Sequence, residues 1–153
     1  MFHEVVEDGA AGAGGTPDAD TNGVTATALL AAFERLLSEA VTEAGRGRVG
    51  DETGVSEAAI EAAAEGDAAE LSLTDGAAIV AVTADRDTDA IVAELRDHLL
   101  MGMATAVLDV DTLAAAIDAD LTGQEVQQAL EGRAGITLGQ LAEVMAVIER
   151  RKR

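Results

Sequence analysis

Two stretches of this chain match each other at a fixed spacing, and this internal match constrains the fold more than any other feature. With Val55 placed on Leu121, 66 residues further along the chain, the apolar, capping and glycine positions of the two stretches coincide. The coincident pairs include Leu29 with Leu95, Phe33 with Leu99, Ile60 with Val126, Gly66 with Gly132 and, after removal of one loop residue, Leu71 with Ile136 and Ser72 with Thr137. Because helix, cap, glycine stop and loop all agree, we infer a duplication.

The first repeat is predicted to be helical. Apolar residues at three- and four-residue spacing predict a long helix over 25–44 that stops at Gly45. A Gly/Arg-rich break follows, and a short helix after Ser56 ends at Gly66. Ser72 then begins a sequence that resembles a capping box, ahead of the apolar segment 77–82.

The second repeat settles an ambiguity in the first. Segment 77–82 alone fits a buried strand, because it contains β-branched residues. Its counterpart, 141–148, has the spacing of an amphipathic helix, so we predict that both are helical. The other helices predicted in the second repeat cover 88–107, 111–117, a segment from the capping box at Thr122 to Gly132, and a segment that starts at the capping box of Thr137.

The predicted fold class is therefore all-α, with two tandem helical, helix-turn-helix-like repeats packed together. The repeats span 25–86 and 88–153, and a flexible N-terminal leader spans 1–24, since 9–24 is rich in Gly, Ala, Asp and Thr without apolar periodicity. We expect the two long helices, which carry Phe33 and Leu99, to form the central contact.

The charge indicates the solvent in which the protein works. Of 153 residues, 29 are Asp or Glu and 10 are Lys or Arg, which gives a formal net charge of −19. Only Lys152 is a lysine, and the carboxylates are spread along the whole chain. This pattern is typical of proteins from a cytoplasm at molar salt, where carboxylate repulsion is screened. We interpret it as halophilic adaptation, so the net charge does not exclude binding to nucleic acid.

Composition also excludes several classes of protein. The chain has no cysteine, which excludes a disulfide scaffold, a thiolate metal site and a thiol nucleophile. The acidic N-terminus differs from a signal peptide, and the most apolar stretch, 99–107, is too short to span a membrane. We therefore expect a cytoplasmic, soluble protein without a membrane partner.

The second repeat resembles a known DNA-binding arrangement. A short helix over 111–117, a turn at Leu121-Thr122 and a second helix from Gln124 to Glu131 resemble the lambda-repressor-like helix-turn-helix family, whose second helix enters a major groove. Segments 97–111 and 126–133 also resemble an uncharacterised haloarchaeal protein family, a domain of unknown function. That second resemblance implies a halophilic origin and no specific chemistry.

The helix-turn-helix resemblance defines candidate nucleic-acid-binding residues. Gln124, Gln127 and Gln128 are the candidates for contacts with base edges, and Arg133 is the candidate for a phosphate contact. The alternative is a solvated helix face on a packing module, because Glu125 and Glu131 on the same helix repel phosphate. The cations over 150–153 are interpreted as a tail that complements the last helix carbonyls, with a phosphate anchor as the alternative.

Other motifs are interpreted structurally. Segment 18–23 begins like a calcium-binding loop, but Leu29 occupies position 12, where a bidentate Glu is required, so we predict a turn. His98 is interpreted as a structural residue. We find no catalytic constellation, metal site or cofactor motif. The predicted function is a non-enzymatic protein-interaction or regulatory module that binds an unknown protein or itself, with a DNA-binding regulator as the alternative.

Overall fold

The all-α fold class is confirmed. The computed structural model describes residues 25–117, 121–131 and 135–151, which form eight α-helices. The helices are α2 (Ala26–Ala44), α3 (Arg46–Thr53), α4 (Glu57–Glu65), α5 (Leu73–Ala84), α6 (Thr88–Ala106), α7 (Val110–Ala116), α8 (Gly123–Leu130) and α9 (Leu138–Arg151). The predicted leader, 1–24, and the calcium-like segment within it lie outside the described residues.

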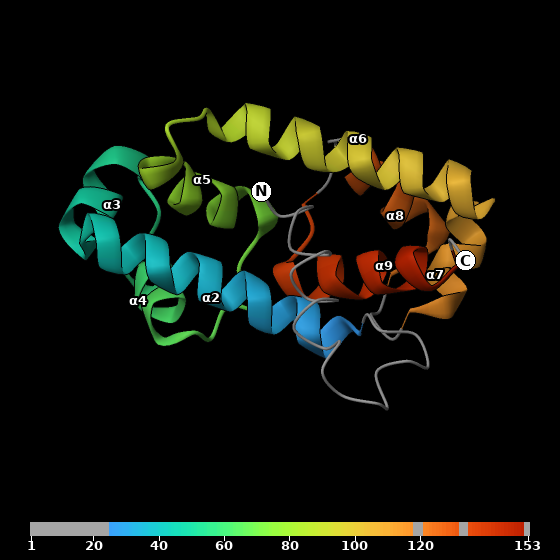
Figure 1. Cartoon of the computed structure of the whole chain (residues 1–153), viewed down its shortest axis with the longest axis horizontal. Coiled ribbons are helices and arrows are strands. Elements are labelled where there is room, and N and C mark those ends of the chain that lie inside the picture. The colour runs from blue at the N-terminus through green and yellow to red at the C-terminus, as the bar shows by residue number, and fades with distance from the viewer. Residues whose placement is uncertain (1–24, 118–120, 132–134, 152–153) are drawn as a thin grey trace.

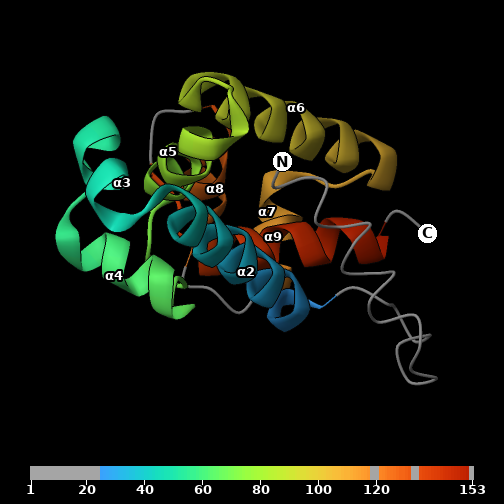
Figure 2. The same cartoon turned by 60° about the vertical axis from the view of Figure 1, so that its left-hand side comes forward.

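Helices α5 and α9 occupy the middle of the molecule. The long helices α2 and α6 run along opposite sides of them, with α3 and α4 at one end and α7 and α8 at the other (Figures 1 and 2). Helix α2 packs on α4, α5 and α9, and α6 packs on α5, α8 and α9. In α9, Leu141, Val144, Met145 and Ile148 are among the buried residues that form the core.

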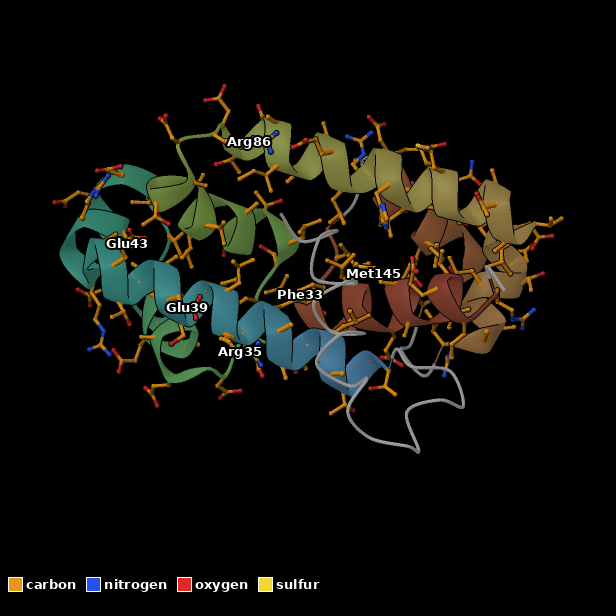
Figure 3. The ribbon with its side chains drawn as sticks, in the orientation of Figure 1. Phe33, Arg35, Glu39, Glu43, Arg86 and Met145 are labelled. Carbon is orange, nitrogen blue, oxygen red and sulfur yellow. The ribbon has the colours of Figure 1, made fainter. Side chains whose placement is uncertain are left out.

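The prediction that α2 and α6 form the central contact is wrong. No substantial contact joins these helices, because α5 and α9 lie between them. Helix α9 buries eight residues, which makes it a stronger core element than either long helix. Phe33 is fully buried on α2, which packs on α9, the helix that carries the buried Met145; both residues are labelled in Figure 3. Leu99 of α6 is also buried, and it lines a small apolar space with Leu141 and Val144 of α9.

The predicted Gly/Arg-rich break after Gly45 is also wrong, because residues 46–53 form helix α3. Two glycines inside a helix cost about 1 kcal/mol each relative to alanine. Tertiary contacts offset that cost, since Val49 is fully buried and α3 packs on α2, α4 and α5. Arg48 and Glu52, one turn apart, also form an ion pair of 2.7 Å.

A short antiparallel bridge joins the two halves of the chain between Ser72 and Thr137. The backbone N–H of Leu73 donates to the Ile136 carbonyl at 2.7 Å, and the N–H of Leu138 donates to the Leu71 carbonyl at 2.8 Å. The sequence match aligns Leu71 with Ile136 and Leu73 with Leu138. Each of the two hydrogen bonds is therefore the counterpart of the other under that alignment. The duplication itself stays a prediction.

The capping boxes are confirmed at Thr122 and Thr137. The Thr122 hydroxyl accepts from the N–H of Glu125, whose carboxylate accepts from the N–H of Thr122. Thr137 and Gln140 exchange the same pair of hydrogen bonds, at 3.1 and 3.0 Å.

Within the described ranges, no single helix is long and apolar enough to cross a membrane. Only α6 and α7 taken together, across a 93° bend, have the length and composition of a membrane span.

Candidate interaction surface

The C-terminal half of α6 and its C-cap, Val107, carry an exposed apolar face, which we name the α6 patch and define as Leu100, Met101, Ala104 and Val107. The side chains of Leu100, Met101 and Val107 are 48%, 70% and 89% exposed, and Ala104 is exposed between them. Spacings of three and four residues place all four on one side of the helix. The other side of the same turns is buried in the core through Leu99 and Met103.

Val107 holds an unusual backbone conformation at the end of α6. Its φ of 56° and ψ of 52° are left-handed. Its N–H donates to the Ala104 carbonyl, and the N–H of Leu108 donates to the Met103 carbonyl, which is the Schellman pattern of helix termination. Glycine is the usual residue there, and an L-residue with a side chain costs roughly 1–2 kcal/mol. The fold therefore places a strained, exposed valine at the edge of the patch.

The segment of the chain that contains the α6 patch is acidic, and carboxylates both precede and follow the patch in the sequence. Between Arg96 and Arg133 the chain contains seven acidic residues and no lysine or arginine. Exposed Asp97 precedes the patch, and exposed Asp109 and Asp111 follow it. The backbone N–H of Thr112, which donates to the Asp109 carboxylate, lowers the pKa of that group, so Asp109 stays ionised well into the acidic range.

Helix α9, which packs against α6, carries charges of both signs in its last turn. His98 of α6 lies 3.8 Å from the Glu149 carboxylate of α9, measured from Nε2 to Oε2. This contact joins two packed helices and agrees with a structural role for His98. Arg150 and Arg151 end α9 and are exposed.

The candidate nucleic-acid-binding glutamines lie together on α8. Gln124 and Gln127 are exposed, Gln128 is half-buried, and Arg133 lies outside the described residues. The Gln127 amide donates to the Glu131 carboxylate at 3.0 Å, so this side chain is engaged with an acidic neighbour. Helix α8 packs on α7 and α6 of its own half. The structure thus leaves part of the predicted face open to solvent but sets it beside carboxylates.

Two of the grooves that open on the described surface have ligand size and partly apolar walls. One, of about 560 Å³, lies between α3 and α4, where Arg46 pairs with Glu61 at 3.2 Å. The other, of about 410 Å³, lies between α5, α6, α8 and the residues that precede α9. Among the described residues, no group of three His, Asp or Glu side chains is placed to hold a metal ion.

The apolar stretch 99–107 is recognisable in the sequence only as too short for a membrane span, and its exposure was not predicted. The sequence did contain one signal, because apolar residues occur on both sides of this helix. Leu99 and Met103 lie on one side, and Leu100, Met101 and Val107 lie on the other. The left-handed Val107 had no signal, because the usual glycine is absent.

Comparison with known proteins identifies a family whose function is unknown. A family model described as a family of unknown function (DUF5791) matches residues 29–151. No curated protein and no solved structure matches the chain.

Proposed function

The chain belongs to this family of unknown function, and we propose that it is a non-enzymatic protein-interaction module that binds its partner through the α6 patch. The observation that carries the proposal is the exposure of Leu100, Met101 and Val107 on one helix face. Single exposed apolar residues are ordinary, whereas the largest apolar patch on a protein is often functional, and all the large exposed apolar residues of the described ranges belong to this one.

The conformation of Val107 supports the same proposal independently. A β-branched residue in the left-handed region is costly, and such strain clusters where a side chain serves binding. Glycine at this position relieves the strain but removes the side chain. A contact with another molecule buries this side chain, which is 89% exposed in the isolated chain.

The charges favour a different protein over a second copy of this chain. In a symmetric pair joined through α6, Asp97, Asp109 and Asp111 of one copy face the same acidic surface on the other. A different protein can place a row of apolar side chains on the patch. Lys or Arg side chains around that row then pair with these carboxylates. Contacts at ion-pair distance depend on salt less than long-range attraction does. We therefore assign the patch to a heterologous partner with a basic rim.

The patch is small, which sets the expected affinity. Its exposed apolar surface is on the order of 300 Å², below the roughly 800 Å² that each side of a standard stable interface buries. We expect a transient complex with a dissociation constant of about 1–100 μM.

Site-specific cross-linking followed by reconstitution tests the proposal. A photoreactive amino acid replaces Met101, and the same group replaces Glu39, an exposed residue of α2, as a control. The protein captured only from position 101 is then purified and its affinity for the native chain is measured. Met101→Glu should weaken binding about tenfold or more, because burial of a methionine contributes about 1.5–3 kcal/mol. Ala31→Glu adds the same charge at an exposed position on α2 and should leave binding unchanged.

Two results overturn the proposal. Equal capture from positions 101 and 39 shows that the patch has no selective partner, and reconstituted binding that is insensitive to Met101→Glu shows that the partner binds elsewhere. Capture of a second copy of the chain from position 101 contradicts the assignment to a heterologous partner.

The DNA-binding alternative rests on one observation, the exposure of Gln124 and Gln127 on α8. It is tested by fluorescence anisotropy with a labelled random-sequence duplex, at the lowest salt at which the circular dichroism spectrum is native. Binding that Gln124→Ala and Arg133→Ala weaken, while Met101→Glu does not, favours the DNA-binding regulator. Absence of binding contradicts the DNA-binding alternative.

A further inference from the structure

We propose that the groove of about 410 Å³ between α5, α6, α8 and the start of α9 binds a small molecule that has one carboxylate and a short apolar chain. Arg96 of α6 pairs with the carboxylate. The site lies on the N-terminal half of α6, away from the α6 patch, and does not rest on the proposed function.

The groove combines an apolar floor with a few polar groups at its rim. Leu73, Val92, Ala129 and Ile136 supply apolar surface, and the polar rim consists of Thr74, Thr88, Asp89 and Arg96. The volume falls within the range of small-molecule sites, which are concave, mostly apolar and furnished with a few orienting polar groups. The residues come from both halves of the chain, because α5 belongs to the first half and α6, α8 and Ile136 to the second.

The floor of the groove continues into a small apolar space beneath it. This space shares Leu73, Ala129, Ile136 and the Arg96 stem with the groove and is lined further in by Leu99, Val126 and Leu141. An apolar chain that lies along the groove therefore meets hydrocarbon on its inner side. The polar end of such a ligand is left at the Arg96 end of the rim.

Arg96 is the group in this groove that is suited to an anion. Its Nε donates to the Leu130 carbonyl at 2.9 Å, which fixes the side chain against the end of α8. Three other described arginines form ion pairs: Arg46 with Glu61, Arg48 with Glu52 and Arg86 with Glu94. Within the part of the chain that the structure describes, Arg96 has no carboxylate partner although it is half-buried. The guanidinium has five N–H donors, and its planar fork matches a carboxylate.

Asp89 limits the ligand to a single negative charge. It lies seven residues before Arg96 on α6, two turns along the same face, which is about 10 Å along the helix axis. A second anionic group at the far end of the ligand meets this carboxylate and is repelled. A neutral chain end is compatible with Val92 and with the hydroxyl groups of Thr74 and Thr88. The structure thus favours a monocarboxylate over a dicarboxylate of equal length.

Nuclear magnetic resonance with three matched probes tests the site. Sodium hexanoate is titrated into the ¹⁵N-labelled full chain, and adipate and hexylammonium are titrated in parallel at constant salt. Hexanoate should shift the Arg96 Nε–H signal and the amides of Ala129 and Ile136 saturably, with a dissociation constant in the millimolar range. Adipate should bind about fivefold more weakly because of Asp89. Hexylammonium should leave the Arg96 signal unchanged.

Two variants assign the shifts to this groove. Ala93→Phe places a large side chain at the mouth of the groove, where Ala93 is exposed, and should abolish the hexanoate shifts. Ala31→Phe adds the same group to an exposed position on α2 and should retain them. Arg96→Lys keeps the charge, removes the fork and should weaken hexanoate about tenfold; if this variant fails to fold, Ala93→Phe still decides.

Three results overturn the proposal. Equal shifts with hexanoate and hexylammonium show apolar adsorption without recognition of the carboxylate. Hexanoate shifts that survive in Ala93→Phe show that the ligand lies elsewhere. Absence of saturable shifts up to the solubility of hexanoate shows that the groove is not a carboxylate site.

Discussion

At the scale of single residues, a substitution of Val107 should have opposite effects on the stability of the fold and on partner binding. Its left-handed backbone is strained, and its side chain contributes little burial because it is 89% exposed. Val107→Gly relieves the strain but adds conformational freedom to the unfolded chain. The net result should be a gain of about 0.5–1 kcal/mol in the free energy of unfolding, measured by denaturant titration, with weaker binding of the partner captured at position 101.

Ala104→Gly provides the matched control, since it also removes a side chain from the α6 patch. Ala104 lies within the helix, so glycine there should lower the free energy of unfolding by about 1 kcal/mol. If Val107→Gly also lowers stability, the left-handed conformation is not a source of strain.

Glu65 is a residue whose charge state should affect stability. A hydrogen bond with Glu61 and the negative charge of Glu61, one turn earlier on α4, raise the pKa of Glu65 above its ordinary value. A raised folded-state pKa means that the ionised pair destabilises the fold at neutral pH and that the penalty disappears as the pH falls below the ordinary pKa of Glu. Glu65→Gln should therefore raise Tm at about pH 7 but not at about pH 3.

Differential scanning calorimetry across this pH range, at constant salt, measures the effect. Glu39→Gln on α2 removes the same charge from an exposed position and serves as the control. A Tm gain of equal size at both ends of the range contradicts repulsion between Glu61 and Glu65 as its cause.

At the scale of helices, the two capping boxes should have different effects on the whole fold. Thr137→Ala removes the cap of α9, which buries eight residues, and should lower the global free energy of unfolding by about 1 kcal/mol. Thr122→Ala removes an equivalent cap from α8, which buries Val126 and Leu130 at one end of the molecule. Its main effect should be faster hydrogen exchange in α8, with a smaller global change. Equal exchange in α8 for both variants contradicts this distinction.

Helix ends were predictable from the sequence because their signals are local. The Thr122 and Thr137 boxes and the stop at Gly45 depend on residues within one turn of each other. Helix α3 was missed because its formation depends on burial of Val49 against helices that are distant in sequence. The contact between α2 and α6 was wrongly predicted for the same reason, since periodicity identifies an apolar face but not its partner.

The candidate sites were less accessible from the sequence than the helices. The pattern placed Gln124 and Gln127 correctly on one helix, but exposure of Met101 depends on where α9 and α8 cover α6 and where they do not. The groove at Arg96 requires residues from α5, α6 and α8 together. No local motif marks such a long-range arrangement.

At the scale of the whole molecule, charge and core are separated. No charged or polar residue is buried among the described residues, and the core consists of Leu, Ile, Val, Met and Ala with Phe33. Alanine permits close helix packing but buries little area per residue. The net charge of −19 is therefore carried by the surface of a fold that apolar burial stabilises only modestly. The salt concentration determines whether repulsion between carboxylates outweighs that stabilisation.

This balance predicts unfolding on dilution from molar salt. At about 1 M salt the Debye length is about 3 Å, whereas at about 0.1 M it is about 10 Å, so neighbouring carboxylates repel each other much more strongly at the lower concentration. Circular dichroism should show a cooperative loss of helix as KCl is lowered. Sucrose, which strengthens burial without screening charge, should restore helix less effectively than KCl of equal osmolality.

A charge variant distinguishes screening from other effects of salt on the core. Replacement of Glu39, Glu43, Asp51, Asp67 and Glu70 by the corresponding amides removes five exposed carboxylates of the first half without altering a helix cap. If repulsion limits stability, this variant should stay folded at lower KCl than the native chain. If salt acts only by strengthening apolar burial, the two proteins should unfold at the same concentration. A native chain that stays cooperatively folded at about 0.1 M salt contradicts the halophilic interpretation of its charge.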